Sequence, residues 1–173
     1  EAAWVSAAER VEAEQALARY AAWASANPRE LVGVEVGFEV VVDVDGEPVT
    51  LVGSVDRLER ESDGRLRVVD FKTGRSTPTK DEVARMPQIG VYQLAIEAGA
   101  FDDVAPGAAS AGASLVYLRH DDNEGWPKEF RQPSLTEAPH LTDDADELAY
   151  PTWVHQRVAQ AHAVLASGRF DAR

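Results

Sequence analysis

A long alternating run over about residues 31–44 is the feature that most constrains this chain. One side of the extended run carries Val34, Val36, Phe38, Val40, Val42 and Val44, and the other carries Glu35, Gly37, Glu39, Val41 and Asp43. Because side chains alternate between the two faces of a strand, this period of two predicts a long strand with one buried face. The Asp45-Gly46 pair that follows is typical of a tight hairpin turn.

The rest of the chain predicts further strands and flanking helices. Strands are expected over about 49–59, 65–72 and 114–119, the first two joined by a turn at Ser62-Asp63-Gly64. Helical periodicity predicts helices over about 5–26 and 87–98 and a last one that ends at Gly168. The expected buried stripe of the first helix is Ala13, Ala16, Leu17, Tyr20, Trp23 and Ala24. Residues 73–79, 99–114 and 120–143 are predicted to be loops.

This order of elements favours a single α+β (mixed α/β) domain over residues 1–173, with helices packed on a central mixed sheet that contains a three-stranded antiparallel meander. No apolar run reaches the ~18 residues that cross a bilayer, and the start of the chain lacks the features of a signal peptide. We therefore expect a cytoplasmic protein with no membrane partner. The chain starts with Glu1 inside a predicted helix, so we expect a fragment of a longer protein.

Two acidic residues and a lysine form the candidate site. Asp70 and Lys72 share one face of the third strand because they are two residues apart. A three-residue turn with a left-handed Gly64 would place Asp56 directly opposite Asp70. Facing carboxylates repel unless a cation lies between them, and a hard divalent metal prefers such oxygen ligands. A two-residue turn would shift the register by one residue and weaken this interpretation.

Glu35 is a weaker candidate ligand. A two-residue turn at Asp45-Gly46 would bring it to the level of Asp56, where it would either join the acidic cluster or remain a solvated strand residue. A divalent metal held by carboxylates can polarise a phosphoryl oxygen and activate a water molecule. Lys72 beside that metal can orient the water or stabilise the charged transition state. The expected chemistry is therefore phosphodiester hydrolysis.

At these residues the sequence resembles the PD-(D/E)XK nuclease superfamily, and within it the RecB-like nuclease domains of bacterial helicase–nucleases. The matching segments are Gly53-Ser54-Val55-Asp56-Arg57, Val69-Asp70-Phe71-Lys72-Thr73-Gly74 and Gln88-Ile89-Gly90-Val91-Tyr92. Their order and spacing are similar to the GxxDR, DxKTG and QxxxY motifs of that branch. The resemblance implies a restriction-endonuclease-like fold at the C-terminal end of a larger helicase–nuclease.

The resemblance also implies roles for individual residues. Asp56, Asp70 and the backbone carbonyl of Phe71 would bind Mg²⁺ or Mn²⁺, and Lys72 would be the catalytic lysine. Gln88 and Tyr92 would position the lysine or the substrate. That substrate would be DNA, expected as a single strand supplied by the helicase portion during DNA repair or recombination, cut by exonuclease or endonuclease action.

Two departures from the branch bear on this interpretation. Its usual upstream histidine is missing, because the histidines here are at positions 120, 140, 155 and 162. With no cysteine in the chain, the iron–sulfur cluster of some relatives is excluded. Two alternatives stay open at this point. One is a catalytically inactive nuclease fold that scaffolds or threads DNA, and the other is a Mg²⁺-dependent phosphohydrolase acting on small molecules.

The charge of the chain is unusual for a DNA enzyme. Thirty acidic residues against 17 lysines and arginines give a net charge of −13. Because affinity for DNA comes mainly from basic groups that displace counterions, we expect the rest of a larger protein to hold the DNA. Four basic residues near the motifs are candidates for phosphate contacts, or alternatively solvated surface: Arg57, Arg75, Lys80 and Arg85.

Overall fold

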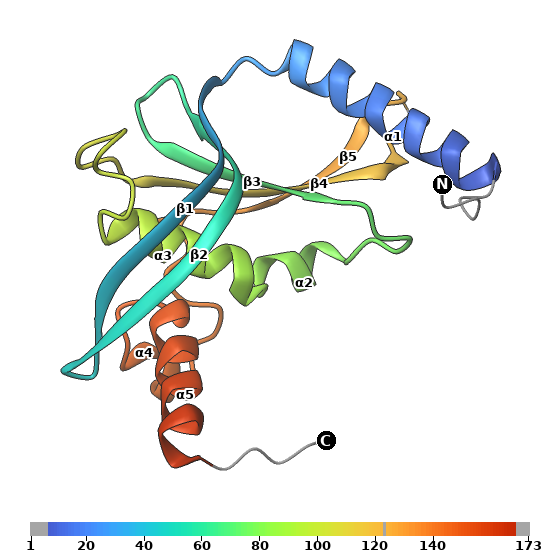
Figure 1. Ribbon diagram of the computed structural model, residues 1–173. Coiled ribbons are helices and arrows are strands. Elements are labelled where there is room, and N and C mark those ends of the chain that lie inside the picture. Colours follow the sequence, from blue (N-terminus) through green and yellow to red (C-terminus); the bar gives the residue numbers. More distant parts are fainter. Residues whose placement is uncertain (1–6, 123, 169–173) are drawn as a thin grey trace.

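The computed structural model describes residues 7–122 and 124–168, which form a five-stranded sheet with helices on both faces (Figure 1). The strands, in their order across the sheet, are β1 (Glu30–Val44), β2 (Glu47–Arg60), β3 (Leu66–Lys72), β4 (Ser110–Asp121) and β5 (Pro127–Gln132). The helices are α1 (Ala7–Ala26), α2 (Lys80–Ala84), α3 (Pro87–Glu97), α4 (Ala145–Leu148) and α5 (Trp153–Ser167). Strands β3 and β4 run parallel and the other neighbours antiparallel, so the predicted mixed sheet with its antiparallel meander is confirmed.

Turn chemistry sets the register of the β1–β2 hairpin. Asp45 and Gly46 have φ angles of 57° and 80°, and Val44 pairs with Glu47, as expected for a two-residue turn. The alternation fails at one position, because Glu35 has a φ of 48° and interrupts the extended backbone. Val34 is consequently 57% exposed, and its predicted place on the buried face is wrong.

The β2–β3 hairpin has the predicted three-residue turn. Gly64 has a φ of 90°, and the N–H of Glu61 donates to the carbonyl of Arg65 at 2.9 Å. Glycine adopts this left-handed backbone without a steric cost, whereas few other residues, chiefly Asp and Asn, tolerate it. The same register continues along the ladder to the pair Arg57–Val69, so the predicted pairing of these strands is confirmed.

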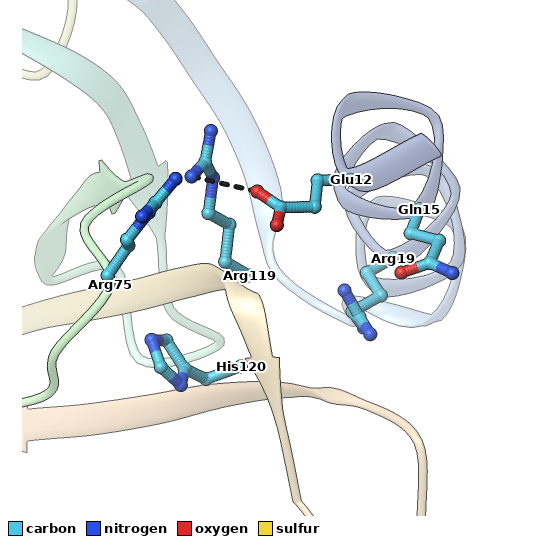
Figure 2. A pocket seen from close by; sticks show the side chains of 6 residues that line it. All are labelled: Glu12, Gln15, Arg19, Arg75, Arg119 and His120. Atoms are coloured by element: carbon cyan, nitrogen blue, oxygen red, sulfur yellow. Dashed lines mark ion pairs between the residues drawn. The ribbon is translucent and has the colours of Figure 1, made fainter. Parts of the chain in front are cut away.

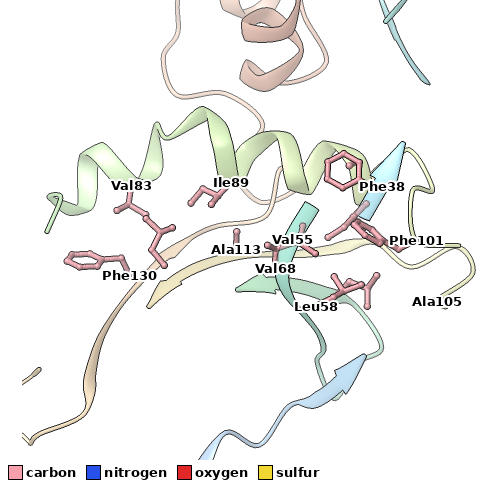
Figure 3. Packing of buried hydrophobic residues seen from close by; sticks show 14 of the residues in the cluster. Phe38, Val55, Leu58, Val68, Val83, Ile89, Phe101, Ala105, Ala113 and Phe130 are labelled. Carbon is pink, nitrogen blue, oxygen red and sulfur yellow. The ribbon is translucent and has the colours of Figure 1, made fainter. Parts of the chain in front are cut away.

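Two apolar layers enclose the sheet. Helices α2 and α3 cover one face, where Val83 and Ile89 pack with Leu58, Val68 and other residues of the main core (Figure 3). Helix α1 covers the other face of β3 and β4 through Trp23, which packs with alternate strand residues. Helix α5 packs against α3 and the far end of the β1–β2 hairpin, which extends well beyond the rest of the sheet (Figure 1).

The helices and strands differ from the predictions in four places. In α1, Leu17 is 66% exposed and Ala13 is also exposed, whereas Ala16, Tyr20, Trp23 and Ala24 turn towards the sheet as predicted. Strand β4 begins at Ser110 rather than at residue 114, β5 lies in the segment 120–143 predicted to be a loop, and α2 lies in a segment for which no element is predicted. The first two residues of the predicted helix 5–26 lie outside the described residues.

The final helix matches its prediction, since Gly168 takes a left-handed φ of 62° directly after α5. Within the described part of the chain, no helix is long and apolar enough to cross a membrane.

Candidate active site

The candidate site lies at the carboxyl end of β3. Alternation along this strand sends Val68, Asp70 and Lys72 to the side covered by α2 and α3, while Val69 and Phe71 pack towards α1. Val68 and Val69 are fully buried. The apolar strand therefore holds the carboxylate and the ammonium at a fixed place where the core meets solvent.

Asp56 joins this site from β2. The paired part of the β2–β3 ladder ends at Arg57 and Val69, so Asp56 and Asp70 occupy the next position in the same register. The carboxylate of Asp56 accepts a hydrogen bond of 2.8 Å from the backbone N–H of Phe71. This bond fixes the Asp56 side chain against β3 and leaves its other oxygen available to a ligand.

The environment of the Asp70 carboxylate disfavours its charged form. The residue is 4% exposed, and its Oδ2 forms an ion pair with Nζ of Lys72 at 2.7 Å but has no other partner among the described residues. Burial raises the pKa of Asp70 above its ordinary value, and the negative charge of Asp56 raises it further. Lys72 opposes both effects without cancelling them. Two neighbouring carboxylates that share a single ammonium keep an excess of negative charge, which suits a bound cation.

Lys72 is held by a short chain of polar contacts from α3. Its ammonium donates to Oε1 of Gln88 at 3.1 Å, and the amide of Gln88 donates to the hydroxyl of Tyr92 at 3.1 Å. Gln88 and Tyr92 share a helix face because they are one turn apart. The ring of Tyr92 also lies edge-on to Phe38, with 6.1 Å between centroids. The structure thus brings together all three segments that carry the motifs.

Tyr117 is a neighbour of the site that the sequence analysis did not identify. It pairs with Lys72 across the parallel β3–β4 ladder and is 7% exposed. Burial raises the pKa of its phenol, Lys72 lowers it, and Asp70 raises it. The only signal in the sequence is a tyrosine inside a predicted strand, and the long connection between β3 and β4 hides its register.

Two further residues that the sequence offered as candidates are Glu35 and Arg57. Glu35 lies at the level of Asp56, between the pairs Val34–Arg57 and Val36–Val55, and its role as a metal ligand stays a prediction. Among the described residues, no group of three or more histidine, aspartate or glutamate side chains could hold a metal. Glu35 is exposed on β1. Arg57 is not available for phosphate contacts, because it is 7% exposed, lies 5.5 Å from the ring centroid of Trp23, and pairs with Glu59 at 2.6 Å.

The donor set nevertheless fits a hard divalent cation. Asp56 and Asp70 supply two adjacent carboxylates, and Lys72 is the one cation that pairs with Asp70 among the described residues. Mg²⁺ keeps several water ligands and commonly binds through one or two carboxylates. The backbone of Phe71 faces Asp56 through its N–H, and we expect its carbonyl on the same side, since both groups of a strand residue point to one neighbour.

Comparisons with known proteins identify the family of the chain. The sequence matches the PD-(D/E)XK nuclease superfamily over residues 1–173. The chain is also similar to the crystal structure of SSO0001, with 17% sequence identity and a TM-score of 0.48. That similarity covers 92% of this chain and 62% of the other, so this chain spans less than two thirds of that protein. No curated protein matches the sequence.

Proposed function

The chain belongs to the PD-(D/E)XK nuclease superfamily, and on this basis we propose that it is a metal-dependent deoxyribonuclease domain. The observation that carries the proposal is the convergence of Asp56, Asp70 and Lys72 at the end of β3. Asp56, Asp70 and the Phe71 carbonyl would hold Mg²⁺ or Mn²⁺. When bound, this ion supplies Lewis-acid polarisation of the phosphoryl oxygen and lowers the pKa of a water molecule.

The protein's own residues would then position the reacting groups. Lys72 would orient the attacking water or stabilise negative charge on the phosphoryl oxygens in the transition state. Gln88 accepts from the lysine ammonium, and Tyr92 in turn fixes the amide of Gln88. This chain of contacts would restrict Lys72 to a narrow range of positions before substrate arrives.

The larger setting of this activity is also part of the proposal. We infer a RecB-like nuclease domain joined to a helicase in DNA repair or recombination, acting on single-stranded DNA. Two observations support it: the order of the GxxDR, DxKTG and QxxxY segments, and a net charge of −13, which lowers the affinity of the domain for DNA. In that arrangement the helicase portion holds the DNA and this domain cuts it.

Metal binding gives the first test. Calorimetry with Mn²⁺ should detect binding to the wild-type protein and none to Asp70→Asn, which removes a charge without changing shape. Asp103→Asn is the matched control, because Asp103 is exposed on the loop that meets the start of β3, at the opposite end of the strand from Asp70. Equal binding by all three proteins would contradict a site at Asp56 and Asp70.

Cleavage gives the second test. With Mg²⁺, the wild-type protein should degrade linear single-stranded DNA, and Asp70→Asn should be at least ~100-fold slower, since even the loss of a residue that only hydrogen-bonds to a metal ligand costs about 10–100-fold. Cutting of a closed circular single strand would reveal endonuclease action, because that substrate has no ends. Metal binding without cleavage of any DNA would contradict the nuclease proposal and favour an inactive scaffold.

A further inference from the structure

A basic pocket lies next to the candidate site, on the side of the sheet that α1 covers. It has a volume of about 320 Å³ and lies between α1, the end of β4 and the loop after β3 (Figure 2). Its lining residues are Glu12, Gln15, Arg19, Arg75, Arg119 and His120. Three of the chain's 17 lysines and arginines thus meet at one place in a strongly acidic molecule.

The guanidinium groups of this pocket are incompletely neutralised. Arg75 makes no ion pair or hydrogen bond among the described residues, and Figure 2 shows it reaching from its loop towards Arg119. Arg119 pairs with Glu12 of α1 at 3.1 Å. Arg19 donates to the carbonyl of Leu118 at 3.2 Å and approaches Asp121 at 3.4 Å. Adjacent cations of this kind repel one another unless an anion lies between them.

The pocket is connected to the candidate site by a short and well-fixed path. Arg75 follows Lys72 by three residues, which places its Cα within about 11 Å of the lysine. His120 lies three residues after Tyr117, and its Nε2 is 3.2 Å from the carbonyl oxygen of Gly74. Successive phosphates of one strand in duplex DNA are roughly 3.4 Å apart along the helix axis, and those of an extended single strand are further apart. The pocket therefore lies within a few nucleotides of the candidate site.

We propose that this pocket binds a backbone phosphate of the DNA strand being cut, a few nucleotides from the scissile bond. Arg75 and Arg119 donate to its oxygens, since the planar guanidinium matches phosphate geometry. Glu12 is the internal anion that the phosphate displaces from Arg119. This site rests on the proposed DNA-cleaving function and adds a contact that the candidate active site does not contain.

The test is the binding of a fluorescent twelve-residue oligothymidylate, measured by anisotropy in EDTA. A protein group that contacts one phosphate of a single strand releases the counterions of that phosphate. Each such contact contributes about 0.7 to the slope of log affinity against log salt concentration, which corresponds to about a fivefold change in affinity at 0.1 M salt. Arg75→Gln should weaken binding by about that factor and lower the slope. Glu12→Gln should strengthen binding, because it removes the competing carboxylate.

Matched variants separate the pocket from general charge effects. Arg157→Gln, on the distant helix α5, removes one positive charge, as Arg75→Gln does. Glu14→Gln, on α1 outside the pocket, removes one negative charge, as Glu12→Gln does. Equal shifts in the control and pocket variants would overturn the proposal, as would wild-type binding by both pocket variants. If Glu12→Gln changes the binding of inorganic phosphate but not the binding of the oligonucleotide, the proposal is also overturned, because the pocket would then serve a free anion.

The assay separates this proposal from the proposed function. It contains no metal, so its outcome does not depend on cleavage. Weaker DNA binding by Arg75→Gln with no cleavage by the wild-type protein would leave the pocket intact and contradict the nuclease. Normal cleavage by the wild-type protein, together with DNA binding that Arg75→Gln leaves unchanged, would support the nuclease and contradict the pocket.

Discussion

At the residue scale, Asp70 is costly for the folded protein and useful for the proposed chemistry. Burial and the neighbouring Asp56 both disfavour its charged form, and the ion pair of Oδ2 with Lys72 offsets this only in part. Proteins tolerate such sites where function requires them, since a buried charge that is only partly offset otherwise lowers stability. A bound cation would offset the repulsion between the two carboxylates.

Asp70→Asn should therefore stabilise the metal-free protein while it abolishes cleavage. Because the pKa of Asp70 is raised on folding, its ionisation destabilises the fold as pH rises from the ordinary value of 3.8 through the raised pKa. Thermal melting in EDTA at pH 7 should show a higher Tm for the variant, and the difference should narrow towards pH 3.8. A lower Tm at pH 7 would contradict this account of Asp70.

The contacts of Lys72 with Gln88 and Tyr92 predict a graded loss of activity. Gln88→Leu removes the acceptor for the lysine ammonium and should lower kcat about tenfold with little change in KM. Tyr92→Phe removes only the hydroxyl that Gln88 contacts, so its effect should be smaller. Steady-state cleavage kinetics check the order of the two variants. An effect confined to KM would indicate that Gln88 binds substrate instead of positioning the lysine.

At the element scale, an ion-pair network secures the edge of the β2–β3 hairpin to the chain that enters β1. Glu61 accepts from Arg29 at 2.9 Å and from Arg67 at 2.5 Å. Burial raises the pKa of Glu61, but the two arginines outweigh it and hold the pKa below the ordinary value of 4.5. The network therefore stabilises the fold above pH 4.5 and loses this contribution as pH falls through the lowered pKa.

Glu61→Gln should lower the free energy of unfolding by about 1 kcal/mol at pH 7, because it weakens two charge-assisted hydrogen bonds of a partly exposed group. Urea unfolding measures the change. The difference from wild type should shrink below pH 4.5. Glu47→Gln, at the exposed start of β2, is the control and should change stability by less than half as much.

At the scale of the whole molecule, the contact between α3 and α5 joins the main core to the far end of the β1–β2 hairpin. Gly90 of α3 is buried against Trp153 and Val154 of α5, and a Cβ at this position would lie 2.8 Å from both side chains. Trp153 is 2% exposed and packs in the same cluster as Val42 and Val44 of β1. The missing side chain of Gly90 is therefore what allows α5 to cover the hairpin.

Gly90→Ala should destabilise the protein by about 1–3 kcal/mol, although alanine favours a helix more than glycine does. The expected cause is overpacking against Trp153, and urea unfolding gives the magnitude. Gly37→Ala is the control, because its Cβ would meet nothing closer than 3.9 Å, and it should be nearly neutral or stabilising. A stabilised Gly90→Ala variant would show that α5 moves away from α3 without cost.

The sequence by itself determined the features that depend on neighbouring residues. Turn chemistry at Asp45-Gly46 and Gly64 set the registers of two hairpins, and the period of two along β3 placed Asp70 and Lys72 on one face. These are local properties of the backbone, so a pattern of a few residues is sufficient to predict them. The candidate pairing of Asp56 with Asp70 follows from the same local geometry.

Only the tertiary structure decided which distant segments meet. The long connection between β3 and β4 leaves their register open, so Tyr117 beside Lys72 and the hydrogen bond between His120 and Gly74 follow from packing. The exposure of Leu17, the burial of Arg57 and the basic pocket between α1 and β4 have the same origin. In each case the surroundings of a side chain are set by contacts across the sheet, which no short stretch of sequence contains.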